Sequence, residues 1–157
     1  MKNWYLIKTK HRQEKIAKQN LENQGYRAFC PIAKINNQLV VLFPGYLFAQ
    51  LNDKTQNWSP IHSTKGVSHF VKFGLNYAKV PTSVIKFFKI NQHITSEKLK
   101  KLNKFKSGDK VQISDGSFKN CVAIFKCYKP NERVILLINF LGQEQSLSIQ
   151  KESVIDL

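Results

Sequence analysis

Residues 63–74, Ser-Thr-Lys-Gly-Val-Ser-His-Phe-Val-Lys-Phe-Gly, decide how the first half of this chain folds. Every second position from residue 67 to residue 73 is predicted to face inward, which is typical of a β-strand that packs one side on a core. These inward positions are Val67, His69, Val71 and Phe73. The turn before them, Thr64-Lys65-Gly66, is polar and positive, and Gly66 permits close approach of the backbone to a ligand. The stretch therefore predicts a strand that holds the fold and a turn that meets a partner.

The elements on either side of this strand predict a compact α+β domain over residues 1–90. Apolar and β-branched residues indicate strands, and helix formers followed by Gly25 indicate a helix end. A helix at 82–90 begins at Thr82 or Ser83 as its N-cap. The remaining elements predicted are strands at 3–9, 29–32 and 39–43, a helix at 12–24, and a hairpin return at 45–51 after Pro44-Gly45.

The second half of the chain is organised differently. Residues 91–104 are polar and basic, which indicates a linker, and residues 105–157 form a second, smaller region. A turn at Asp115-Gly116 between apolar stretches favours short strands and a small barrel. The continuous apolar run from Val134 to Leu141 fits a strand or a helix equally well, because periodicity alone cannot separate the two.

Charge points to a polyanionic partner. The chain has 25 Lys and Arg against 10 Asp and Glu, a formal net charge of +15. Residues 1–90 carry 14 basic and 3 acidic residues, a net of +11, whereas residues 91–157 carry 11 and 7, a net of +4. Nucleic acid is the first partner to consider, and its site is expected in the first half. An acidic protein partner is the alternative.

Several function classes lack support in the sequence. The three cysteines (Cys30, Cys121 and Cys127) and the four scattered histidines have neither metal-ligand nor redox spacing. No phosphate loop, dinucleotide fingerprint or activated nucleophile is present, so we expect no enzyme, cofactor or metal. The N-terminus does not resemble a signal peptide, and no apolar run reaches membrane-spanning length. A reduced, cytoplasmic protein without membrane contact is expected.

Four motifs occur in a family-specific order: Trp-Tyr-Leu at 4–6, Leu-Phe-Pro-Gly-Tyr-Leu-Phe at 42–48, the stretch at 64–74, and Gly-Asp-Lys-Val at 108–111. Together they resemble the NusG family of transcription elongation factors. The Gly-Val-Ser-His-Phe-Val-Lys-Phe-Gly block is most similar to its specialised antiterminator subgroup, the RfaH proteins. The resemblance extends over nearly the whole chain.

The resemblance implies an N-terminal domain at 1–90, with a four-stranded antiparallel sheet flanked by helices, that binds RNA polymerase. It implies a C-terminal KOW domain at 105–157, as a β-barrel or as a helical hairpin docked on the first domain. In the RfaH subgroup the first domain also reads the single-stranded non-template DNA of a paused elongation complex. The released barrel contacts a small-subunit ribosomal protein. The protein is expected to act as a monomer.

The resemblance also implies which residues bind. Phe43, Tyr46 and Phe48 correspond to the contact with the clamp helices of polymerase, although the same aromatics would otherwise be assigned to the core. We expect Tyr46 to be exposed once the C-terminal region is released. The DNA-binding positions are Lys10, His11, Gln13, Asn20, Thr64 and Lys65. Lysines suit phosphates, whereas amides and hydroxyls suit base edges.

Four functions therefore stand after the sequence alone. The first is an RfaH-like antiterminator recruited by non-template DNA, which reduces pausing and acts by binding alone. The second is a general NusG-type elongation factor without DNA sequence specificity. The third is an RNA-binding or ribosome-associated module that uses the KOW barrel. The fourth, a nucleic-acid enzyme, has no supporting site.

Overall fold

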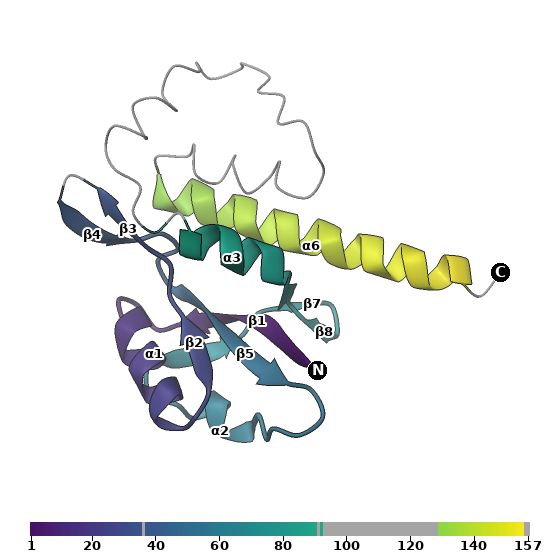
Figure 1. Cartoon of the computed structure of the whole chain (residues 1–157), viewed down its shortest axis with the longest axis horizontal. Coiled ribbons are helices and arrows are strands. Elements are labelled where there is room, and N and C mark those ends of the chain that lie inside the picture. The colour runs from purple at the N-terminus through teal and green to yellow at the C-terminus, as the bar shows by residue number, and fades with distance from the viewer. Residues whose placement is uncertain (36, 91, 93–128, 156–157) are drawn as a thin grey trace, which may run out of the picture.

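A computed structural model describes residues 1–35, 37–90, 92 and 129–155 of the chain (Figure 1). The order of strand, helix, strands and helix expected over the first ninety residues is observed, and the domain is α+β. Its helices are α1 (Glu14–Asn23), α2 (Ser59–His62) and α3 (Thr82–Ile90), and α6 (Pro130–Ile155) follows in the C-terminal region. Its strands are β1 (Lys2–Thr9), β2 (Arg27–Phe29), β3 (Ile32–Ile35), β4 (Gln38–Val41), β5 (Tyr46–Asn52), β6 (Val67–Phe70), β7 (Lys72–Phe73), β8 (Asn76–Tyr77) and β9 (Lys79–Val80).

The main sheet has β1 at its centre. Its strand order is β2-β5-β1-β6, and β9 pairs with the other end of β1 beside β6. All of these pairings are antiparallel. The predicted four-stranded antiparallel sheet is therefore confirmed, with β9 as a short fifth strand. β1 is buried along most of its length because helices cover both faces of the sheet.

The predicted hairpin return at 45–51 is wrong. β5 does not pair with β4; it lies between β1 and β2, and its register with β1 runs from Lys2↔Asn52 to Lys8↔Tyr46. β4 pairs with β3 in a separate hairpin that projects from the domain (Figure 1). The apolar residues of β5 are buried on both faces, as a central strand requires, whereas β4 is exposed or half-buried and suits a projecting hairpin.

The alternation predicted from residue 67 to residue 73 fails at its centre. Val67 and Phe70 are buried, whereas Ser68 and His69 are both exposed. The cause is a β-bulge: Lys8 pairs with His69 and Thr9 pairs with Val67, so Ser68 has no partner across the ladder. A bulge inserts one residue and reverses the faces beyond it. The stretch is therefore split into β6 and β7, and His69 points outward instead of into the core.

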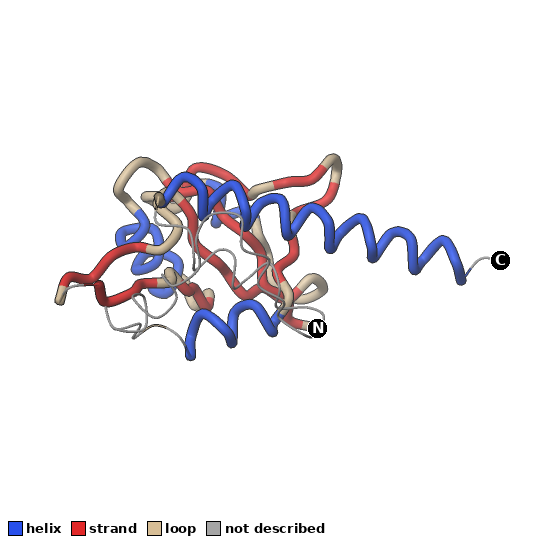
Figure 2. The backbone as a smooth tube through the Cα atoms, turned by 90° about the horizontal axis from the view of Figure 1, so that it is seen from above, coloured by secondary structure: helices blue, strands red, loops and turns tan. Residues whose placement is uncertain are grey.

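Each face of the sheet has its own core. The first core contains Tyr5, Ile7, Ala17, Leu21 and Phe70 among others, and it lies under α1 and α2. The second contains Trp4, Leu6, Phe43, Phe48 and Phe88 among others, and it lies under α3. Residues of α6 complete this second core, and Figure 2 shows α6 continuing well beyond the sheet toward the C-terminus.

The C-terminal region is helical where the structure describes it. The run from Val134 to Leu141, which periodicity could not assign, belongs to the 26-residue helix α6. Arg133, Leu137, Phe140 and Leu141 are buried, at the three- and four-residue spacing of a helix face. Residues 146–150 are part of the same helix. Except for residue 92, the predicted linker at 91–104 lies outside the described residues, as do the Asp115-Gly116 turn and the rest of 105–128.

Gly66 is the glycine on which the packing of α1 depends. It has φ of +91°, and a Cβ atom there would lie 2.7 Å from the backbone nitrogen of Ala17. The close approach foreseen at Gly66 is therefore an approach to helix α1 and not to a ligand. Gly74 also has a positive φ, +62°, but a Cβ there would meet no atom within 4 Å.

Alanine substitutions at these two glycines distinguish the energetic cost of backbone strain from that of a steric clash. We expect Gly74→Ala to cost about 1 kcal/mol in unfolding free energy through strain alone. Gly66→Ala should cost about 3 kcal/mol or more, because it adds a clash with a helix backbone. Urea unfolding followed by circular dichroism measures both. Equal losses in the two variants would contradict the packing of Gly66 on α1.

Candidate nucleic-acid interface

The end of β1 lies between two glycine turns. The amide of Thr9 donates to the carbonyl of Gly45 at 2.8 Å, and the amide of Lys10 donates to the carbonyl of Gly66 at 2.8 Å. The second bond places the turn that carries Lys65 beside Lys10. Lys10 and Lys65 are both exposed. Two lysines separated by 55 positions in sequence are thus brought to one place by the sheet.

A tight turn then leads from β1 into α1. The amide of Gln13 donates to the carbonyl of Lys10 at 3.0 Å, and Arg12 has a left-handed φ of 56°. His11 and Arg12 at the tip of this turn are exposed, and Gln13 is half-buried. The structure therefore brings Lys10, His11 and Gln13 together with Lys65 at one corner of the domain.

Asn20 is linked to this corner by a residue that the sequence did not single out. The side-chain amide of Gln24 donates to the carbonyl of Asn20 at 3.1 Å and to the hydroxyl of Thr64 at 2.9 Å. Asn20 is half-buried and lies seven residues, about two helical turns, after Gln13 on the same side of α1. The spacing of four residues between Asn20 and Gln24 was the available signal for this link.

Thr64 has a different role from the one expected. Only 5% of the residue is exposed, and its hydroxyl donates to the carbonyl of Pro60 at 2.9 Å while it accepts from Gln24. A hydroxyl occupied on both sides inside the protein is not available to a base edge. Thr64 therefore positions the turn, and Lys65 is the residue of that turn which faces solvent.

The predicted polymerase contacts are divided between core and surface. Phe43 and Phe48 are fully buried, with ring centroids 6.2 Å apart, and Phe43 packs edge-to-face on Phe88 at 5.1 Å. Tyr46 is half-buried, and the ammonium of Lys8 lies 4.3 Å from the centre of its ring.

Helix α6 closes the same cluster. Its residues Leu137, Phe140 and Leu141 are buried together with Phe43 and Phe48. In this arrangement a partner protein cannot reach Phe43 or Phe48 unless α6 leaves the face. Phe43 and Phe48 are therefore core residues in this structure, packed on Phe88 of α3 as well as on α6.

The three acidic side chains of the first domain all have hydrogen-bond or ion-pair partners. Glu14 is buried and accepts from the amide of Gly45 at 2.7 Å, and Glu22 pairs with Lys18 at 3.0 Å. Asp53 accepts hydrogen bonds from Tyr5 and Asn3, and Lys79 lies 3.6 Å away. Within residues 1–90, no acidic group other than these three is present to offset the 14 basic residues.

The hydrogen bond between Tyr5 and Asp53 shifts the pKa of both groups. Burial, with Asp53 as acceptor, raises the pKa of Tyr5 far above its usual value. Desolvation acts to raise the pKa of Asp53, but hydrogen bonds from Tyr5 and Asn3 and the charge of Lys79 hold it below its usual value. Tyr5 thus anchors the loop after β5, away from the corner that carries Lys10.

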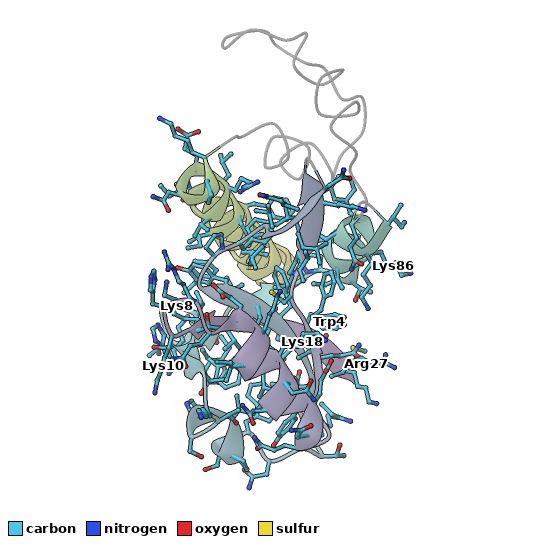
Figure 3. All side chains as sticks on the ribbon, turned by 90° about the vertical axis from the view of Figure 1, so that its left-hand side faces the viewer. Trp4, Lys8, Lys10, Lys18, Arg27 and Lys86 are labelled. Atoms are coloured by element: carbon cyan, nitrogen blue, oxygen red, sulfur yellow. The ribbon has the colours of Figure 1, made fainter. Side chains whose placement is uncertain are left out.

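Figure 3 shows how the cations are distributed. Lys8 and Lys10 lie on one side of the domain, and Arg27 and Lys86 lie on the opposite side.

Among the described residues, no three His, Cys, Asp or Glu side chains are grouped so that they could hold a metal ion. His62 packs edge-on against Phe70 at 5.2 Å, and Nδ1 of His69 lies 2.9 Å from the hydroxyl of Ser68. In the described part of the chain, no helix has the length and apolarity to cross a membrane.

Comparison with known proteins gives a consistent result. Residues 2–89 match the family model described as transcription termination factor NusG. The transcription termination/antitermination protein NusG of Thermus thermophilus is 24% identical over 97% of this chain and 97% of its own. The protein of the same name from Chlamydia pneumoniae is 25% identical over 92% and 88%. A solved structure, described as domain interaction in Thermotoga maritima NusG, has a TM-score of 0.47 at 22% identity, covering 74% of this chain and 67% of that one.

The role of Thr64 as a positioning residue can be tested by stability. Thr64→Val keeps the shape of the side chain but removes its hydrogen bonds to the Gln24 amide and the Pro60 carbonyl, so we expect a loss of about 1 kcal/mol in unfolding free energy. Lys65→Ala, at the exposed neighbouring position, should change stability by less than about 0.5 kcal/mol. Chemical denaturation measures both. A Thr64→Val variant as stable as the parent would remove this role.

Proposed function

Because the chain belongs to the NusG family of transcription termination factors, we propose that it binds RNA polymerase through its aromatic face and nucleic acid through its basic corner. Members of this family are transcription factors and not enzymes. The observation that carries the proposal is the meeting of Lys10 and Lys65 through the bond between Lys10 and Gly66. A transcription factor of this kind acts by binding alone, so it requires these surfaces and no catalytic group.

The aromatic face is the proposed polymerase surface. It consists of Phe43, Tyr46 and Phe48, and the clamp helices of polymerase are its proposed partner. Large apolar side chains in a contiguous patch are a usual feature of protein interfaces. The patch exists only when α6 is displaced, since Leu137, Phe140 and Leu141 cover it in this structure. Docking of α6 and capture of polymerase would therefore exclude each other.

The basic corner is the proposed contact for the single-stranded non-template DNA. Lys10 and Lys65 would bind phosphates, and His11 would add charge or stack on an unpaired base. Gln13 and Asn20 carry amides that suit base edges. Thr64, although counted among the DNA-binding residues from the sequence, would act by holding the turn that presents Lys65.

A general NusG-type elongation factor is the better supported form of this function. The relatives compared above are named as NusG transcription termination/antitermination proteins, and their names give no support to sequence-specific DNA recruitment. The RfaH-like alternative has one observation in its favour, which is helix α6 packed on the aromatic face. Coupling to a ribosomal protein through residues 105–157 belongs to the same alternative.

Binding to paused elongation complexes distinguishes the general NusG-type function from the RfaH-like one. Complexes that differ only in the non-template sequence are mixed with the full chain and resolved by gel shift. Equal retention on all sequences is expected of the general factor. Retention on one sequence alone would replace it with the RfaH-like function.

Point variants separate the two proposed surfaces. Lys10→Ala and Lys65→Ala should each weaken loading on the elongation complex about fivefold at 0.1 M salt, because each removes one phosphate contact. Tyr46→Ala should weaken binding to polymerase that carries no nucleic acid. Lys86→Ala on the opposite side of the domain is the matched control (Figure 3). Unchanged loading by both corner variants would refute the nucleic-acid assignment.

Two variants of α6 test whether its docking limits polymerase binding. Gly142 lies within the helix, and a Cβ atom there would sit in ordinary contact with the ring of Phe73, at 3.7 Å. Gly142→Ala should stabilise the helix by about 0.5–1 kcal/mol and weaken polymerase binding about two- to fivefold. Leu141→Ala removes a fully buried side chain of the docked face and should strengthen binding.

Fluorescence anisotropy with labelled chain and polymerase measures these effects. Circular dichroism checks that the helix content of each variant moves in the expected direction. If both variants bind polymerase as the parent does, α6 does not compete with polymerase for the aromatic face.

A further inference from the structure

Lys8 lies in a row of side chains that crosses three strands. In the register of the sheet it is paired with Tyr46 on β5 and with His69 on β6. Residues paired across antiparallel strands project from the same face of the sheet. Tyr46, Lys8 and His69 therefore stand side by side, beyond the apolar part of the face that α6 covers. Neither Lys8 nor His69 has a role in the function proposed above.

The ammonium of Lys8 is held in one position. It lies 4.3 Å from the centre of the Tyr46 ring, which is the geometry of a cation–π contact. A Cβ atom at Gly45 would lie 3.0 Å from the same nitrogen, so the glycine leaves the space that the ammonium occupies. The turn at Pro44-Gly45 thus shapes the site as well as redirecting the chain.

The bulge in β6 adds polar groups beside Lys8. A regular strand would bury one of two successive residues, but here Ser68 and His69 are both exposed. The hydroxyl of Ser68 lies 2.9 Å from Nδ1 of His69. This contact orients the imidazole and leaves its other nitrogen available to a ligand. Bulges often re-aim side chains at functional sites.

No carboxylate neutralises Lys8 within the part of the chain that the structure describes. Glu14 on α1 is the acidic residue that reaches this turn, and its carboxylate is occupied by the amide of Gly45 at 2.7 Å. No ion pair joins Glu14 to Lys8. Lys8 is therefore a positioned cation that the described residues leave available to an external anion.

Lys8 is also continuous with the basic corner. Lys10 follows it by two residues and comes directly after Thr9, the last residue of β1. Figure 3 shows Lys8 and Lys10 on the same side of the domain. The bond from Lys10 to Gly66 then brings in Lys65. Lys8, Lys10 and Lys65 therefore all lie near the end of β1.

We propose that Lys8, with His69 beside it, forms a further phosphate subsite for the single-stranded nucleic acid that binds at Lys10 and Lys65. The inference rests on the proposed function, since it extends the strand already placed at the basic corner. An acidic side chain of polymerase is the rival ligand. The three neighbouring lysines favour nucleic acid, because its backbone carries one charge per nucleotide and can pair with several cations at once.

Salt dependence tests the subsite directly. The full chain is titrated with a fluorescent single-stranded dT20 oligonucleotide at several salt concentrations between 50 and 200 mM. Loss of one phosphate contact lowers the slope of log K against log salt by about 0.7 for single strands, which corresponds to about fivefold in affinity at 0.1 M salt. Lys8→Gln should produce this change, and Lys8→Arg should restore most of the affinity.

Three matched variants make the result decisive. Lys86→Gln, on the opposite side of the domain, should leave both affinity and slope unchanged. Lys10→Gln tests the basic corner itself and should lower the slope by a similar amount. Gly45→Ala, which places a methyl group against the ammonium, should weaken binding of the oligonucleotide as Lys8→Gln does.

The outcomes are separable. If Lys10→Gln lowers the slope and Lys8→Gln does not, the subsite is refuted and the basic corner stands. If neither changes the slope, the proposed nucleic-acid function fails along with the subsite. If Lys8→Gln weakens binding to polymerase without nucleic acid and leaves dT20 binding intact, Lys8 contacts protein and the inference is overturned.

Discussion

The pairing of β1 with β5 is the constraint on which the rest of the structure depends. Seven residue pairs, from Lys2↔Asn52 to Lys8↔Tyr46, fix which side chains share a face. A shift of one residue would turn every side chain of β1 to the other side of the sheet. In the observed register Trp4 and Leu6 face the core under α3 and α6, and Tyr5 and Ile7 face the core under α1. Lys8 follows on the first of these faces, so the same register that builds the core also sets the cation beside Tyr46.

The aromatic face has to satisfy two requirements that conflict. Phe43 and Phe48 need burial for stability, and a partner needs them exposed. Helix α6 meets the first requirement with three buried side chains, Leu137, Phe140 and Leu141. Full burial of such a side chain contributes about 1.5–3 kcal/mol. A partner that displaces α6 must therefore supply apolar surface of comparable extent, which restricts this face to large, apolar protein surfaces. Small or purely charged ligands lack such a surface and are not expected to displace α6.

The sequence was sufficient wherever a local pattern had one interpretation. β1, α1 and α3 followed from periodicity, helix ends and caps, and the motifs at 42–48 and 64–74 identified the family. It was insufficient where a choice depended on contacts between distant residues. Burial of β5 on both faces places it between β1 and β2 instead of beside β4. The bulge at Ser68 arises from the pairing of β6 with β1. The role of Gly66 depends on its packing against α1, and the hydroxyl of Thr64 is occupied by a hydrogen bond from Gln24, forty positions away. Each of these depends on side chains that meet only after folding.

The run from Val134 to Leu141 shows the same principle in its strongest form. Nearly every residue in it is apolar, so a helix and a strand would each find an apolar face. The choice falls to whatever surface receives the segment. The core around Phe43 and Phe88 receives a helix, because residues 133, 137, 140 and 141 reach it together while Ile135 and Asn139 remain exposed. A strand would direct 137 and 140 to opposite sides and bury only one of them there. The helical state of this segment is thus a property of the aromatic face as much as of its own sequence.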